Sequence, residues 1–195
     1  MQPTQLTSLA GLADLLAPIE ARAPRAGDFD FLARLYASTR VDLHSNTVDP
    51  AFVASLIAMQ QRLQGASYRR DYPDAASLII EQRGAPCGRM VVNVAADTVR
   101  LIDIALLPPV CGQGLGRHIL GALQRWAASQ TLPLALAVHH TNPAARRLYL
   151  ALGFQSRSRT AFAEHLVWNN ESPSHGLHEP HDPHEPHAPP SSSPP

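Results

Sequence analysis

The spacing of apolar residues predicts two helices in the first third of the chain. Over residues 29–38 and 51–64, apolar side chains recur every three or four positions, as they do along one face of an α-helix. The second helix begins near Pro50, because proline is tolerated in the first turn of a helix. The expected buried face of the second helix consists of Phe52, Leu56, Met59 and Leu63. Residues 68–73 follow this helix as a rim segment, although their aromatic side chains would cap the core equally well.

From residue 77 the period of the pattern changes to two, which is the period of a β-strand. Three such runs follow one another across short turns and predict an antiparallel meander. A helical stretch and a further apolar run then predict a parallel βαβ crossover. The expected fold class is α/β, with a mixed sheet of about seven strands and helices on both faces. The predicted strands are 19–23, 77–82, 87–94, 99–107, 132–138, 156–160 and 162–168.

A glycine-rich turn separates the third strand of the meander from the following helix and reads Cys111-Gly112-Gln113-Gly114-Leu115-Gly116. Glycine permits a tight bend, and the first turn of a helix adds unpaired N–H donors at the positive end of its dipole. The turn is therefore typical of an anion-binding site. A P-loop is excluded because the chain contains no lysine, and no acidic residue is placed as a Rossmann fingerprint requires.

The segment after the crossover reads Asn142-Pro143-Ala144-Ala145-Arg146-Arg147-Leu148-Tyr149 and closes on Gly153-Phe154. Taken together, this segment and the glycine turn resemble the GCN5-related N-acetyltransferases, the GNAT superfamily. The resemblance implies a GNAT fold, acetyl-CoA as co-substrate, and a small-molecule or peptide amine as acceptor.

The resemblance also assigns the cofactor contacts. The amides of the turn would bind the pyrophosphate, and the end of the preceding strand would bind the pantetheine arm beside a strand that splays away. The residues so assigned are Leu106, Leu107, Cys111, Gly112, Gln113, Gly114, Leu115, Gly116, Arg117, Asn142 and Ala145. The family usually has arginine or glutamine where this chain has Cys111, and the loss of that phosphate contact would weaken binding by about ten- to a hundredfold.

Tyr149 lies at the position of the family's general acid, where it would protonate the leaving thiolate. The general base stays open at this stage. Asp103 is the only acid on the central strand, but it would serve equally well as a structural acid bound to an arginine or to a backbone amide. His139 and His140 follow the next strand, and alternation places only one of them in the cleft. A chain of water molecules is the remaining alternative.

In the family, the turn between the first two helices lies over the acceptor side of the cleft. The resemblance therefore makes Arg40, Asp42, His44 and Asn46 acceptor contacts, with His139 as a further one, although a solvated polar loop explains the same residues. Polyamine or aminoglycoside acceptors would require an acidic cleft, and the balanced charges of this region do not decide the matter.

Composition sets limits on the function. All 16 basic residues are arginines within the first 160 positions, so the body of the chain is mildly positive, which suits an anionic cofactor but not a nucleic-acid partner. No apolar run reaches the length of a membrane span, and two cysteines do not suggest a disulfide framework. A cytoplasmic protein without a membrane partner is expected.

Three parts of the chain are expected to differ. Residues 1–17 form a helical extension packed on the body or on a partner subunit, residues 18–170 form the acetyltransferase domain, and residues 171–195 form a disordered tail rich in histidine and proline. The tail histidines recur every third residue, which suits weak metal binding or a pH response, or reflects compositional bias alone. No metal site is expected in the domain, and a homodimer is compatible with the fold.

The leading hypothesis is an N-acetyltransferase that moves the acetyl group of acetyl-CoA to a primary amine by direct transfer in a ternary complex. The alternative is a catalytically weak binding module of the same fold, whose N-terminal helix or histidine-rich tail holds a partner or a metal. A third hypothesis, transfer of a different acyl group, depends on the size of the cleft.

Overall fold

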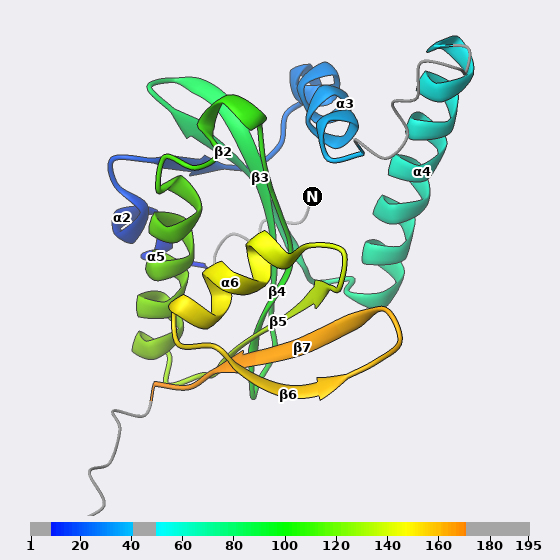
Figure 1. Cartoon of the computed structure of the whole chain (residues 1–195). Coiled ribbons are helices and arrows are strands. Elements are labelled where there is room, and N and C mark those ends of the chain that lie inside the picture. The colour runs from blue at the N-terminus through cyan, green and yellow to red at the C-terminus, as the bar shows by residue number, and fades with distance from the viewer. Residues whose placement is uncertain (1–8, 41–49, 171–195) are drawn as a thin grey trace, which may run out of the picture.

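The computed structural model of the protein describes residues 9–40 and 50–170 (Figure 1). The acceptor contacts predicted at Asp42, His44 and Asn46 lie outside the described residues, as do the first eight residues and the histidine-rich tail. In the described part, no helix is both long and apolar enough to cross a membrane. Within the same ranges, no three His, Cys, Asp or Glu side chains gather as metal ligands.

Seven strands form one mixed sheet in the order β1-β2-β3-β4-β5-β7-β6. β4 and β5 pair in parallel, and helix α5 (Leu115–Ser129) connects them as the crossover prediction required. The neighbouring pairs are antiparallel. The predicted fold class is therefore confirmed. The strands are β1 Glu20–Arg22, β2 Ala76–Gln82, β3 Ala85–Val94, β4 Val99–Leu106, β5 Leu134–His139, β6 Gln155–Arg159 and β7 Ala163–Trp168.

The main hydrophobic core lies between the sheet and three helices, α2 (Leu12–Leu16), α5 and α6 (Pro143–Ala151). The indole N–H of Trp126 on α5 donates to the carbonyl oxygen of Ala10 at 2.9 Å, and His118 Nε2 lies 2.8 Å from the carbonyl oxygen of Leu16. The N-terminal segment thus packs on α5 and holds the start of that helix, where the glycine turn lies.

Helices α3 (Phe29–Ser38) and α4 (Pro50–Asp71) lie on the opposite face of the sheet (Figure 1). Phe31 and Leu35 of α3 pack on Ile79 of β2 in a small second cluster. The α4 side of this layer is thin, because Ile57 is the one buried side chain among those described on α4. Short 3-10 turns at Ala26–Asp28 and Pro108–Val110 precede α3 and the glycine turn.

Helix α4 is longer than the pattern predicted. It runs on to Asp71, so the expected rim at residues 68–73 begins as the last turn of the helix. The chain has no proline between Pro50 and Pro73 that would end the helix. Gly65 weakens the helix by about 1 kcal/mol but does not end it.

The predicted buried face of α4 was wrong. Phe52, Met59 and Leu63 are 61%, 45% and 62% exposed, Leu56 is half-buried, and Ile57 is 7% exposed. Two glutamines explain the rotation. Gln60 and Gln64 accept hydrogen bonds from the guanidinium groups of Arg40 and Arg89 on the inner side of the helix. Buried cations require polar partners, so the polar face of α4 is turned inward.

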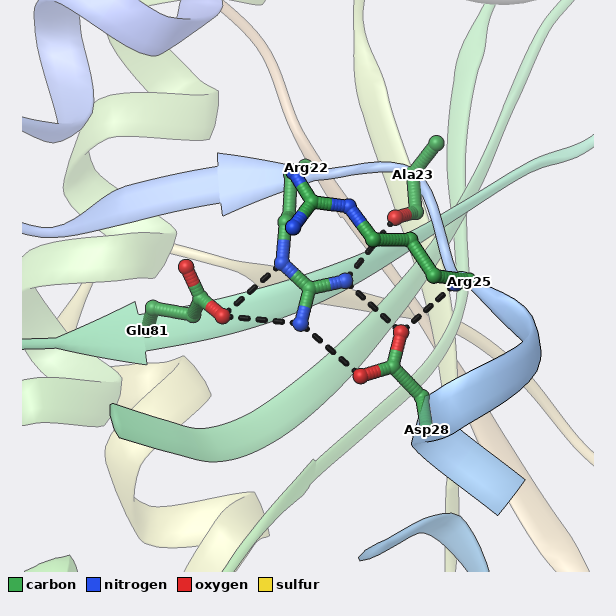
Figure 2. A network of polar contacts seen from close by, with 5 residues as sticks. All are labelled: Arg22, Ala23, Arg25, Asp28 and Glu81. Carbon is green, nitrogen blue, oxygen red and sulfur yellow. Dashed lines mark hydrogen bonds and ion pairs between the residues drawn. The ribbon is translucent and has the colours of Figure 1, made fainter. Parts of the chain in front are cut away.

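A network around Arg22 fixes the start of α3 against the edge of the sheet (Figure 2). Its guanidinium group donates to both carboxylate oxygens of Asp28 at 2.7 and 2.8 Å and to Glu81 of β2 at 2.8 Å. The backbone N–H of Arg25 adds a bond of 2.6 Å to Asp28. Arg22 first, and then the Arg25 amide, holds the pKa of Asp28 well below its usual range.

Glu164 of β7 is a second buried acid, held by Arg146 of α6 at 2.6 Å and by Arg159 of β6 at 3.3 Å. The hydrogen bond from Arg146, followed by that from Ser156, lowers the pKa of Glu164 to about 2. Because the folded-state pKa lies below the ordinary 4.5, the stabilisation is complete above pH 4.5 and is lost as the pH falls toward 2.

We therefore expect Glu164→Gln to lower the melting temperature at pH 7 and to flatten its dependence on pH between 4.5 and 2. Thermal unfolding measured across this range by circular dichroism tests the expectation, with Glu20→Gln on β1 as an exposed control. Parallel curves for the wild type and the Glu164 variant would contradict it.

Candidate functional site

Strands β4 and β5 are paired over three residues and then separate. Val99–Leu101 align with Leu134–Leu136, and no pairing between the strands continues beyond them. The N–H of Leu107 donates to the carbonyl oxygen of Cys87 in β3 at 2.9 Å. Backbone groups alternate along a strand, so the N–H groups of Ile104 and Leu106 point away from β3 and into the gap.

A β-bulge at Ile102 decides which side chains of β4 face which side of the sheet. Leu101 aligns with Val92 of β3 and Asp103 aligns with Val91, so Ile102 has no partner. The extra residue reverses the alternation. Leu101 and Ile104 both pack into the main core, whereas Arg100 and Asp103 both face the side that α4 covers.

A cavity of about 420 Å³ occupies the gap between the two strands. One wall is formed by the inner face of α4, the floor is formed by β4, β5 and β7, and the far end is formed by α6. The cavity therefore extends from the α4 side of the sheet to the α6 side. The polar residues that line it are Gln64, Tyr68, Tyr72, Arg100, Asp103, His139, Asn142, Tyr149 and His165.

Tyr149 of α6 is 7% exposed and lines this cavity, and its ring makes an edge contact with Phe154 at 5.7 Å between centroids. Burial, and then the negative charge of Asp103, raises the pKa of Tyr149 to about 12. The phenol is consequently a proton donor at every physiological pH. The hydroxyl of Tyr68 on α4 is similarly held protonated, since burial raises its pKa to about 12.

Asp103 lines the same cavity but is paired. Its Oδ2 accepts a hydrogen bond from Arg89 of β3, whose Nη2 also lies 3.4 Å from Gln64 Oε1. Its second oxygen, Oδ1, has no hydrogen-bond partner within residues 9–40 and 50–170. Of the roles that the sequence left open for Asp103, the structure thus shows the structural partner of an arginine. The Oδ1 oxygen of Asp103 is still available to accept a hydrogen bond from a ligand.

The glycine turn adopts the conformation that only glycine takes without strain. Gly112 and Gly114 have φ of 75° and 84°, and no atom lies within 4 Å of the position that a Cβ would occupy at either residue. Gly114 is the N-cap of α5 and supplies no side-chain cap, so the amides of Leu115, Gly116 and Arg117 lack acceptors within the helix. Leu115 itself is buried, and the side chain of Arg117 is exposed.

Other residues assigned to the cofactor are partly engaged within the fold. Asn142 caps α6, since its Oδ1 accepts a hydrogen bond from the N–H of Ala145 at 3.0 Å. The side chain of Gln113 donates to the carbonyl oxygen of Pro109 at 2.7 Å, which leaves the backbone of Gln113 for a ligand. The thiol of Cys111 lies 3.4 Å from the carbonyl oxygen of Leu107 and is exposed.

The predicted acceptor contacts separate in the structure. His139 lines the cavity, whereas Arg40 at the end of α3 is bonded to Gln60 of α4 and does not line it. Sequence reasoning missed Arg100 and His165. Arg100 was visible as a polar residue between the apolar Val99 and Leu101, but His165 could be placed only once β7 was known to pair with β5.

Comparison with known proteins agrees with this architecture. The sequence model of the acetyltransferase (GNAT) family matches residues 42–154. No curated protein sequence matches the chain significantly. Among solved structures, the PaiA N-acetyltransferase from Thermoplasma acidophilum in complex with coenzyme A is similar over 77% of this chain and 98% of its own, with 17% identity and a TM-score of 0.58.

An acetyltransferase from Thermus thermophilus is similar over 77% of this chain and 96% of its own, with 18% identity and a TM-score of 0.56. The ribosomal-protein-S18-alanine N-acetyltransferase from Escherichia coli is similar over 82% and 98%, with 20% identity and a TM-score of 0.54. These identities show a shared fold. With the family match over more than half of its residues, the chain belongs to the acetyltransferase (GNAT) family.

Proposed function

We propose that this protein transfers the acetyl group of acetyl-CoA to a primary amine by direct transfer in a ternary complex. The observation that carries the proposal is the cavity in the gap between β4 and β5, which is lined by residues from both sides of the sheet, among them Tyr149 with its protonated hydroxyl. Two substrates can meet there from opposite sides. The family and the neighbour solved with coenzyme A support the choice of acyl donor.

The residues of the glycine turn fit the pyrophosphate of this donor. The space beside Gly112 and Gly114 is open, and the free amides at the start of α5 are aimed at it together with the positive end of the helix dipole. Arg117 adds an exposed cation one turn away. Between this turn and the gap, the N–H groups of Leu106 and Ile104 can donate hydrogen bonds to the pantetheine arm.

Acetyl-CoA supplies the thioester, and the chain supplies the proton handling. A bond forms between the amine nitrogen and the thioester carbonyl carbon, the carbon–sulfur bond breaks, the nitrogen loses a proton and the sulfur gains one. The Tyr149 hydroxyl donates its proton to the sulfur and is reprotonated from solvent, and an N–H of β4 in the gap stabilises the developing oxyanion. Asp103 Oδ1 holds the amine, whose proton leaves through the mouth of the cavity past His139.

The test combines calorimetric titration of acetyl-CoA into the full-length chain with thiol release in the presence of primary amines. Micromolar binding and amine-dependent release of coenzyme A are the expected results. Absence of binding at millimolar acetyl-CoA would contradict the proposal and favour a binding module. If acetyl-CoA binds tightly but no amine causes release of coenzyme A, acetyl-CoA remains the proposed ligand and the transfer reaction is rejected.

A further inference from the structure

Resting on this proposed function, we propose that the acceptor is an amine that also carries an anionic group, and that Arg100 binds this group at the end of the cavity where β4 and β5 are paired. The sequence left the charge of the acceptor open. The structure assigns it through the groups that line the cavity on the α4 side.

The first observation is that Asp103, the one acidic residue in the described cavity lining, is paired with an arginine. Asp103 is neutralised by Arg89, whose guanidinium lies behind it on β3. Arg100 lines the same cavity, and within residues 9–40 and 50–170 its side chain has no carboxylate or other hydrogen-bond partner. The described cavity wall therefore carries one uncompensated positive charge. A half-buried guanidinium favours an anion as its partner because its desolvation is otherwise not offset.

The second observation is the arrangement of hydrogen-bond donors on the same face. The antiparallel register aligns His139 with Ala163 and His165 with Ala137, so the two histidines are diagonal neighbours on the face that Arg100 shares. Ala137 and Ala163 lie opposite the two histidines in the cavity lining, and their small side chains leave room above the sheet. An imidazole N–H donates to anions. His165, opposite Ala137 and two positions along β5 from the partner of Arg100, adds to the same preference, whereas His139 lies at the separated end.

The third observation is the order of groups along the cavity. Arg100 aligns with Ala135, where β4 and β5 are still paired, whereas Asp103 and Tyr149 lie where the strands have separated. The reacting amine must reach the separated end, since the proposed path of the pantetheine arm brings the thioester carbonyl there. At about 3.3 Å per strand residue, the anionic group binds on the order of 10 Å away from the amine. Polycationic acceptors would place a second ammonium group beside Arg100.

The experiment compares three acceptors of equal length, namely 6-aminohexanoate, hexylamine and 1,6-diaminohexane, with acetyl-CoA and the full-length protein. A second set, Ala-Ala-Glu-amide, Ala-Ala-Gln-amide and Ala-Ala-Lys-amide, distinguishes a peptide from a small molecule as the source of the anion. The wild type is expected to use the anionic member of at least one set about tenfold better in kcat/KM than the neutral member.

Arg100→Gln should abolish this preference while changing kcat/KM for the neutral acceptor less than about threefold, and Arg100→Glu should reverse the preference toward the cationic member. Arg157→Gln, on the exposed edge strand β6, is the control for the change in net charge and should behave as the wild type does. A wild-type preference for the cationic acceptors, or an equal loss for all acceptors in Arg100→Gln, would overturn the inference.

Calorimetric binding of the same acceptors to the protein loaded with coenzyme A separates this inference from the proposed function. If no amine is acetylated but the loaded protein binds the anionic acceptor, and Arg100→Gln removes that binding, the anion site stands and the reaction fails. If neutral amines are acetylated and the loaded protein shows no anion preference, the reaction stands and the anion site fails.

Discussion

Replacing Tyr149 by phenylalanine is expected to lower kcat by about a hundredfold or more, because a positioned general acid contributes about 10² to 10⁴ in rate. The substitution removes one hydroxyl and retains the ring that packs on Phe154, so the main core and the binding of acetyl-CoA should change little. Single-turnover formation of the acetylated amine, with the acetyl-CoA affinity measured in parallel, checks the expectation.

Tyr36→Phe is a matched control, because Tyr36 is a partly buried tyrosine on α3 that does not line the main cavity. It should leave kcat within about twofold of the wild type. Equal effects of the two substitutions, or a rate unchanged by Tyr149→Phe, would assign Tyr149 to the core alone.

The pH dependence of the wild type follows from the same residue. Burial, and then Asp103, raises the pKa of Tyr149 to about 12, so the hydroxyl remains a donor as the pH rises past 10, the pKa of an ordinary tyrosine. We therefore expect no fall in kcat from this group up to pH 10. A loss of rate with a midpoint below 10 that disappears in Tyr149→Phe would contradict the buried position of the hydroxyl.

Replacing Gly114 by tryptophan is expected to weaken acetyl-CoA binding by about a hundredfold or more. Charge-assisted hydrogen bonds are worth about 1.5–3 kcal/mol each, and an indole at this position fills the space in front of the free amides of α5. Calorimetric titration of acetyl-CoA into both proteins measures the difference.

A side chain at Gly114 also strains the backbone, because φ is 84° there. Gly84→Trp is the matched control, since Gly84 lies in the turn between β2 and β3 with φ of 74° and has the same open surroundings. Both variants should lose similar stability in thermal unfolding, and only Gly114→Trp should lose the cofactor. Equal affinities for acetyl-CoA would move the pyrophosphate site away from the turn.

Much of the fold could be predicted because it depends on local patterns. The period-two runs of β2, β3 and β4 each carry their own alternation, and the helical spacing from Leu115 to Trp126 is independent of what the helix packs against. The predicted buried face of α4 also depended on local apolar spacing, and it was wrong. Phe52, Met59 and Leu63 do form an apolar stripe, but Gln60 and Gln64 have partners on other elements that no local pattern reveals.

The side chains of the cavity show the same difference between local and long-range information. Tyr149 is singled out through the family resemblance of its segment, and the glycine turn through the tight bend that glycine permits; both signals are carried by a few consecutive residues. The meeting of Tyr149 with Asp103, and of His139 with His165, requires strand order and register, which connect residues far apart in the chain.

By itself, therefore, the sequence determined the order of strand, glycine turn and helix, and placed Tyr149 on its helix, since each of these depends on neighbours within a few positions. Only the tertiary structure decided the charge that the cavity presents. The unpaired Ile102 turns Asp103 to the side of Arg100, and Arg89 on the adjacent strand then neutralises Asp103 and leaves Arg100 without a carboxylate in the described residues. A bulge arises from how two strands pair, and no single strand encodes it.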